Sequence, residues 1–151
     1  MIKPKRVGGF LIAKIHHAAK RIFSKMLKAQ GLGSINSAQG RILFVLWQKD
    51  GIPISDLARK TALEKSTLTA MLDRLERKGL VHRRRSLEDR RTILISLSPS
   101  HAKLEKKFEQ VSAEMAELFY KGLSEGECAL FDETLKRIYA NLEDAEKNAR
   151  P

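Results

Sequence analysis

The fold of this chain is decided by residues 66–97, which run STLTAMLDRLERKGLVHRRRSLEDRRTILISL. Apolar residues at helical spacing predict an amphipathic helix over residues 65–78. The core face of this helix carries Leu68, Met71, Leu72 and Leu75. Gly79 suits the left-handed position that commonly follows a helix. An arginine-rich turn over residues 83–91 and an alternating strand over residues 92–97 then predict a β-hairpin with a cationic tip.

Three further helices are predicted before this stretch. Apolar periodicity indicates helices over residues 10–27 and 36–47, and a shorter one over residues 55–60. Asn36 followed by Gln39 is typical of an N-cap with its partner at the third helical position. The short helix and the amphipathic helix, joined by a brief turn, form the two halves of a helix-turn-helix.

Two long helices are predicted after the hairpin. Ser98-Pro99 is typical of an N-cap with proline at the first helical position, and Ser124 with Glu127 matches a capping box. Both helices repeat apolar residues at alternating spacings of four and three. The two seams are Leu104, Phe108, Val111, Met115 and Leu118, then Phe131, Leu135, Ile138, Leu142 and Ala145. A chain of this length has little other core to cover them, so we expect a homodimer.

Composition bounds the class of protein. The 151 residues suit one domain, or one domain plus an appended helical layer, and the net charge of +11 favours a polyanionic partner. Residues 1–30 carry eight Lys or Arg and no acid, whereas residues 101–151 sum to −3. The single cysteine, Cys128, excludes an intramolecular disulfide and fits a reducing compartment. With no apolar run near the roughly 18 residues of a membrane span and no signal-peptide core, we expect a cytoplasmic protein without a membrane partner.

The outer face of the 65–78 helix and the hairpin tip are suited to double-stranded DNA. That face carries Ser66, Thr67, Ala70, Asp73, Arg74 and Arg77. Small hydroxylated residues in the first turns let a helix approach bases in the major groove, while the later arginines suit phosphates. At the tip, Arg90 and Arg91 beside Asp89 are typical of arginines that enter a minor groove. A basic surface turn alone is often just solvated, but the combination with a helix-turn-helix favours DNA binding.

The same stretch resembles the winged helix-turn-helix of MarR-type (multiple antibiotic resistance regulator) transcription factors. The matching residues are Ser66 to Thr69, Leu75 to Val81, Arg83, Asp89 to Arg91, and Ile95 to Ser98. The resemblance implies a mainly α fold with a small β-wing (α+β). It also implies a homodimerisation helix over residues 1–34, a winged helix-turn-helix over 35–98, and further dimerisation helices over 99–151. Two lobes would read the half-sites of a pseudopalindrome.

Residue roles follow from this resemblance. Ser66, Thr67 and Thr69 would contact the groove, Arg74 a phosphate, and Asp89 with Arg91 the wing-tip pair. The full set predicted to bind DNA is Ser66, Thr67, Thr69, Ala70, Arg74, Arg77, Arg83, Arg85, Asp89, Arg90 and Arg91. Ala70 departs from the family, many members of which have arginine there, so no operator sequence follows.

The predicted function is a sequence-specific transcriptional regulator, a repressor, that is not an enzyme and carries no cofactor or metal. Family members often bind a small aromatic or anionic effector between the dimer helices and the reading lobe, although no residue here identifies that pocket. Two alternatives stay open at this point: an architectural protein that coats DNA without sequence preference, and a helical interaction protein with an acidic partner. Cys128 lies in the last helix, unlike the N-terminal cysteine of peroxide-sensing members, and we expect a buried structural thiol there.

Overall fold

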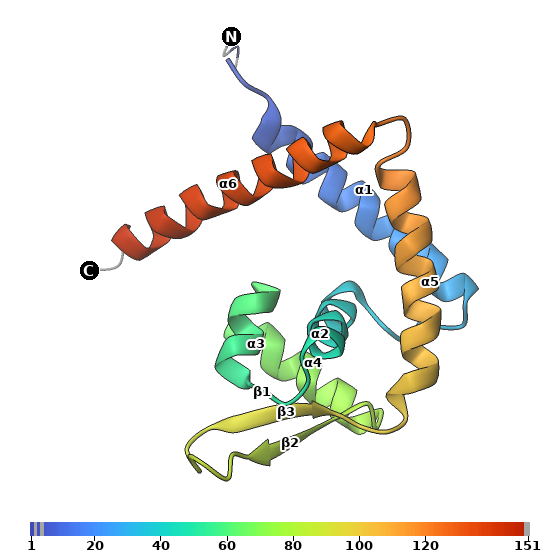
Figure 1. The fold of residues 1–151 in the computed structure, drawn as a ribbon, viewed down its shortest axis with the longest axis vertical. Coiled ribbons are helices and arrows are strands. Elements are labelled where there is room, and N and C mark those ends of the chain that lie inside the picture. Colours follow the sequence, from blue (N-terminus) through green and yellow to red (C-terminus); the bar gives the residue numbers. More distant parts are fainter. Residues whose placement is uncertain (2, 4, 150–151) are drawn as a thin grey trace. The chain divides into compact units, whose positions relative to one another are not determined.

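The computed structural model describes residues 1, 3 and 5–149. The helices are α1 (Gly8–Ala29), α2 (Ser37–Gln48), α3 (Ile54–Thr61), α4 (Lys65–Arg77), α5 (His101–Phe119) and α6 (Glu125–Ala149), and the strands are β1 (Ile52–Pro53), β2 (Val81–Arg85) and β3 (Ile93–Leu97) (Figure 1). The chain divides into two compact units, residues 1–113 and 114–151. The predicted mainly α fold with a small wing is confirmed.

The core of the first unit lies among α2, α3, α4 and the sheet. The four predicted core residues of α4 are buried: Leu68, Met71, Leu72 and Leu75. They join Leu27 of α1, several residues of α2, and Phe108 and Val111 of α5 in one apolar cluster. Helix α4 has one apolar face, and this cluster buries it. The orientation of α4 within the helix-turn-helix is therefore fixed.

The capping residues predicted at the start of α2 and the left-handed glycine predicted after α4 are both confirmed. Asn36 accepts the N–H of Gln39 at 2.8 Å, and the Asn36 N–H donates to Gln39 Oε1 at 3.0 Å, which completes a capping box. After α4, Gly79 has φ +71°. Its N–H donates to Glu76 O at 2.9 Å and the N–H of Leu80 donates to Leu75 O at 3.0 Å, the pattern of a Schellman motif.

The sheet has the antiparallel order β1-β3-β2. Val81 lies opposite Leu97 and Arg85 opposite Ile93, so the hairpin turn comprises residues 86–92. The prediction that Arg83 lies in the turn is wrong: Arg83 is in β2 and pairs with Ile95. Only Val81 of β2 is buried, and a strand with one inward apolar residue has no alternating pattern to find.

Two more boundaries differ from the prediction. Strand β1 was not predicted, since two residues carry no periodicity and Ile52 is recognised only through its partner Ile95. Helix α5 begins at His101 rather than at Pro99. The N–H of Ser98 donates to Leu80 O at 2.9 Å, which extends the hairpin pairing by one residue and delays the helix.

The second unit contains the end of α5 and all of α6. Ser124 Oγ accepts the N–H of Glu127 at 3.2 Å, as predicted, but the Glu127 carboxylate accepts the Ser124 hydroxyl and not the backbone N–H. Phe131 contacts the rings of Phe119 and Tyr120, with centroids 6.1 and 6.3 Å away. No described residue of α6 is buried, and Ile138 and Leu142 of its apolar seam are 39% and 61% exposed.

Candidate nucleic-acid interface

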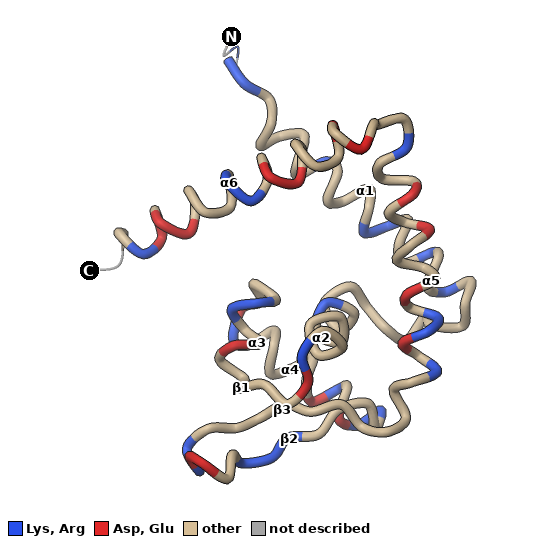
Figure 2. Tube along the Cα trace, viewed as in Figure 1, with Lys and Arg blue, Asp and Glu red and all other residues tan. Residues whose placement is uncertain are grey.

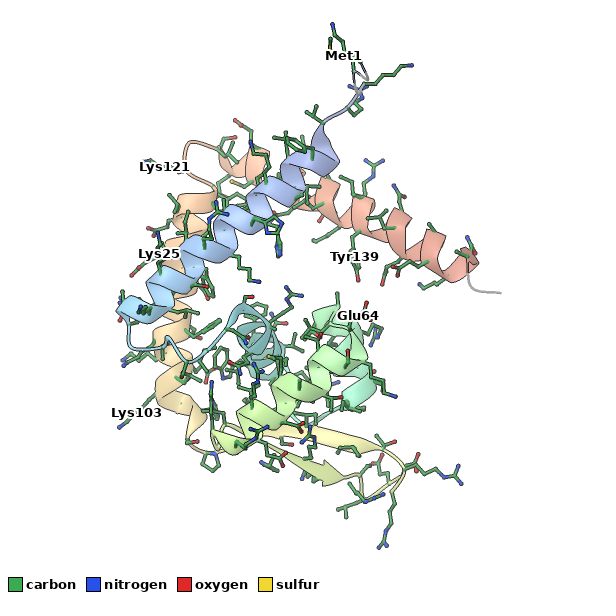
Figure 3. The ribbon with its side chains drawn as sticks, turned by 180° about the vertical axis from the view of Figure 1, so that it is seen from behind. Met1, Lys25, Glu64, Lys103, Lys121 and Tyr139 are labelled. Atoms are coloured by element: carbon green, nitrogen blue, oxygen red, sulfur yellow. The ribbon has the colours of Figure 1, made fainter. Side chains whose placement is uncertain are left out.

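The outer face of α4 is open to solvent. Ser66, Thr67, Thr69, Ala70, Arg74 and Arg77 are all exposed, and Asp73 is half-buried. Glu64, labelled in Figure 3, marks the N-terminal end of this helix. The face therefore presents small polar residues in its first turns and two arginines in its last turns, as predicted.

The hydroxyl groups on this face differ in their availability. Thr69 Oγ1 donates to Lys65 O at 2.9 Å, one turn back along α4. Within residues 5–149 no hydrogen bond occupies the hydroxyls of Ser66 and Thr67. A hydroxyl that already donates to a carbonyl of its own helix is less available as a donor to a base. Ser66 and Thr67 are therefore the better hydrogen-bond donors for a DNA groove.

The turn between α3 and α4 is fixed by a residue that the sequence analysis passed over. Arg41 of α2 donates to the carbonyl of Thr61 at 3.0 Å, and Thr61 Oγ1 donates to Leu57 O at 2.6 Å. Ala62 then takes the left-handed conformation at φ 53°. A non-glycine residue in this region costs about 1 kcal/mol, and the Arg41 hydrogen bond offsets part of it. The angle at which α4 leaves α3 is therefore held by a contact from α2.

Arg83 connects the wing to α4. Its guanidinium donates to Asp73 Oδ1 at 2.8 Å and to Glu76 Oε2 at 2.5 Å. Burial by itself would lower the pKa of Arg83, but the hydrogen bonds and charges of the two carboxylates outweigh it and raise the pKa. The side chain is 25% exposed. Asp73 and Glu76 compensate the positive charge of Arg83. Arg83 should therefore attract DNA phosphates less strongly than Arg84 and Arg85, which are exposed in the same strand.

The wing turn is ordered by side-chain hydrogen bonds to its backbone. The Asp89 carboxylate accepts the backbone N–H of Arg91 at 3.0 Å, and Arg85 donates to the carbonyl of Arg90 at 2.9 Å. In Figure 2 the segments coloured for Lys and Arg follow β2 and reach the tip of the hairpin, and in Figure 3 the side chains of the hairpin extend outward. Asp89 and Arg91, the pair implied by the family resemblance, thus meet through the backbone N–H of Arg91, and Asp89 orders the backbone of the tip.

Leu87, at the same tip, was missed by the sequence analysis. Its side chain is 101% exposed, so none of the described chain covers it. An isolated exposed leucine is ordinary, but this one lies in an ordered turn whose sequence also carries Arg85, Arg90 and Arg91. The signal available in the sequence was a leucine within a run of charged residues.

The remaining sequence predictions concern chemistry outside this face. The expectation of a buried Cys128 is wrong, because the residue is half-exposed one turn into α6. Partial desolvation, together with the nearby carboxylates of Glu125, Asp132 and Glu127, raises the pKa of its thiol.

Among the described residues, no group of three or more His, Cys, Asp or Glu could bind a metal ion. No helix in the described part of the chain is long and apolar enough to cross a membrane.

These elements define a class of protein: three helices, a three-stranded antiparallel sheet and a protruding cationic hairpin make a winged helix-turn-helix. The MarR family model matches residues 35–93. An uncharacterised helix-turn-helix (HTH) type transcriptional regulator, YfiV of Bacillus subtilis, is 31% identical over 123 residues, which cover 68% of this chain and 77% of YfiV. The chain belongs to the MarR family.

Two other proteins extend the comparison. The HTH-type transcriptional repressor MdtR of Bacillus subtilis is 31% identical over 107 residues, covering 68% of this chain and 67% of MdtR. A mutant of MarR from E. coli, solved in complex with operator DNA, superimposes with a TM-score of 0.75 at 27% identity, covering 86% of this chain and 91% of that one.

Proposed function

We propose that this protein is a transcriptional repressor that binds a pseudopalindromic operator as a homodimer. The observation that carries the proposal is the pairing, within one compact unit, of the exposed α4 face with the ordered cationic wing. The family membership of the chain and the operator complex of a related structure support it.

In this mechanism the first turns of α4 enter the major groove. Ser66 and Thr67 have free hydroxyls for base edges, and Ala70 lets the helix approach closely. Arg74 and Arg77, farther along, neutralise phosphates. Arg90 and Arg91 of the wing enter the minor groove, with Arg84 and Arg85 on the flanking backbone and Leu87 against the groove floor.

The homodimer is proposed from the apolar surface that one chain leaves open. In α1, Phe10 is 68% exposed and Ile15 43%, and in α6 Leu130 is 70% and Leu142 61% exposed. We assign residues 1–34 and 99–151 to dimerisation and residues 35–98 to DNA. Two reading lobes then engage half-sites about 34 Å apart. An effector that favours another spacing of the lobes would release the operator, and a cytoplasmic location suits this role.

Footprinting on the DNA upstream of the gene tests the proposal. A discrete protected pseudopalindrome supports a repressor, and uniform protection along the DNA would establish the architectural alternative instead. Affinity should fall with salt by about 0.9 log units per log unit for each neutralised phosphate. Binding that ignores ionic strength would contradict the assigned surface.

Two substitutions separate the proposed roles. Arg74→Ala should weaken binding to all sequences about equally, because a phosphate carries no sequence information. Thr67→Ala should change the preference among operator variants, whereas Thr69→Ala should change it less because that hydroxyl already donates to Lys65. Lys49→Ala, which removes an equal charge from an exposed residue outside the α4 face, the wing and the assigned dimerisation segments, is the matched control and should leave binding unchanged.

A further inference from the structure

Lys78, the C-cap residue of α4, connects that helix to the start of α2. Its ammonium group donates to the carbonyl of Ser34 and, at 3.4 Å, to Gln39 Oε1, which precede it in the sequence by 44 and 39 residues. Lys78 follows the buried Met71 by about two helical turns, so it lies nearly in line with the inward face of α4. The ammonium group is therefore held beside α2, whereas Arg74 is exposed on the α4 face proposed to contact DNA.

The acceptors of this hydrogen bonding belong to an ordered segment. Gln39 is 2% exposed, and its Oε1 also accepts the Asn36 N–H at 3.0 Å within the capping box. Ile35, between the two acceptors in the sequence, is 5% exposed and belongs to the apolar core. Asn36 Nδ2 donates to Met71 Sδ at 3.3 Å, which is a second polar contact between the segment and α4. Lys78 thus meets oxygens whose positions are fixed by the core.

The electrostatics favour a structural contact at Lys78 over a phosphate contact. Although the residue as a whole is exposed, burial of its ammonium group, together with the charge of Arg74, lowers the pKa of Lys78. Within residues 5–149 its hydrogen-bond acceptors are two uncharged oxygens, and no carboxylate pairs with it. Desolvation and a like charge both disfavour the ammonium ion, so the hydrogen bonds to these oxygens stabilise it there. To bind a phosphate, the ammonium group would have to leave both of them.

The hydrogen bond from Lys78 to Ser34 joins two parts of the chain with different proposed roles. Ser34 ends the segment that we assign to dimerisation, and Lys78 belongs to the segment assigned to DNA. Lys107 of α5, also in the part assigned to dimerisation, donates to Gln30 O at 3.4 Å and so contacts the same connection between α1 and α2. All four residues lie within the compact unit of residues 1–113. A tilt of the helix-turn-helix about this connection would have to break the contact of Lys78.

We propose that Lys78 is a positioning residue that holds the helix-turn-helix at a fixed angle to α1 and thereby sets the separation of the two α4 helices in a dimer. The inference rests on the proposed function, because this separation matters only for two half-sites. Lys78 itself touches no DNA in this role and acts through α4. Without its hydrogen bonds the helix-turn-helix keeps its apolar core but tilts over a wider range. Each lobe then still binds a half-site, while the pair selects less strongly between half-site spacings.

Operator duplexes of altered spacing test this role in the full-length protein. One base pair inserted between the half-sites turns one of them by about 34° relative to the other, and wild-type protein should bind this duplex more weakly than the operator. Lys78→Met, which keeps the length of the side chain but removes the ammonium group, should reduce that penalty by about 3- to 10-fold. Its affinity for a duplex with a single half-site should stay within about 2-fold of wild type.

Two further variants complete the comparison. Lys78→Arg keeps the charge and the donors, so it should retain most of the spacing penalty. Lys49→Met, which removes an equal charge from an exposed residue outside these contacts, should leave both measurements unchanged. Because Lys78 is exposed, Lys78→Met should fold, and an unchanged circular dichroism spectrum checks this; if it does not fold, Lys78→Gln replaces it with the same expectation.

Two results would overturn the role of Lys78. The first is a spacing penalty in Lys78→Met equal to that of wild type. The second is weaker binding of the single half-site with a salt slope smaller by about 0.9, because this is the signature of a lost phosphate contact. A wild-type protein that ignores the inserted base pair would instead refute the proposed binding of two half-sites by a dimer, and the inference with it.

Discussion

Gly40 tests whether the packing of α5 on α2 is as tight as the structure shows. A Cβ added at Gly40 would lie 2.9 Å from Cζ and 3.0 Å from Cε2 of Phe108. Carbon atoms prefer about 3.5–4.0 Å, so the ring must move by about half an ångström or more. Phe23 and Trp47 contact the ring on other sides, with centroids 5.5 and 5.1 Å away, and oppose that movement.

Two opposing effects set the magnitude for Gly40→Ala. Alanine should stabilise the helix by about 1 kcal/mol relative to glycine, while overpacking a core costs about 1–3 kcal/mol. We expect overpacking to win by about 1 kcal/mol, which lowers Tm by roughly 2–4 °C for a chain of this size. Gly9→Ala in α1, where a Cβ meets nothing within 4 Å, should instead leave Tm unchanged or raise it slightly.

The assay is thermal and urea unfolding followed by circular dichroism and by Trp47 fluorescence. Phe108→Leu alone should destabilise, but combined with Gly40→Ala it should cost less than the sum, because the smaller side chain makes room. If Gly40→Ala raises Tm as Gly9→Ala does, the close contact between Gly40 and Phe108 does not exist and the reasoning fails.

Three more outcomes follow from the interface. Arg83→Ala should lower the free energy of unfolding, measured in urea, by about 1 kcal/mol, a modest value because Asp73 and Glu76 are partly exposed. Hydrogen exchange in β2 should become faster, and unchanged exchange would refute the connection between β2 and α4 through Arg83. Leu87→Ser should leave Tm unchanged and weaken operator binding about 5-fold. The slope of log affinity against log salt should stay the same, because an apolar contact with the groove floor releases no counterions. A changed slope would count against that contact. Iodoacetamide should label Cys128 slowly at neutral pH and faster as pH rises toward its raised pKa, measured by mass spectrometry; rapid labelling at neutral pH would contradict the expected protonated thiol.

Local signals allowed much of the DNA-facing surface to be predicted. The inward and outward faces of α4 follow from helical spacing alone, as the burial of Leu68 and Leu72 and the exposure of Thr67 and Arg74 confirm. The capping box at Asn36 joins atoms only three residues apart. Such features depend on neighbouring backbone geometry, so a short window of residue types contains all the information they need.

Other features arose from contacts between distant parts of the chain. Arg83 appears in the sequence as one of three equivalent arginines, and only the approach of β2 to α4 gives it two carboxylate partners. Strand β1 exists because Ile52 meets Ile95. The start of α5 at His101 depends on the bond between Ser98 and Leu80.

By itself, the sequence therefore determined the helices, their faces, the hairpin and the family. Tertiary structure alone decided which arginine is compensated by carboxylates, how the turn before α4 is fixed, and that Trp47 and two glutamates line one hollow between α2 and α5. The physical reason is that charge compensation and enclosure depend on distances in space between residues far apart along the chain, and no periodicity or local motif encodes those distances.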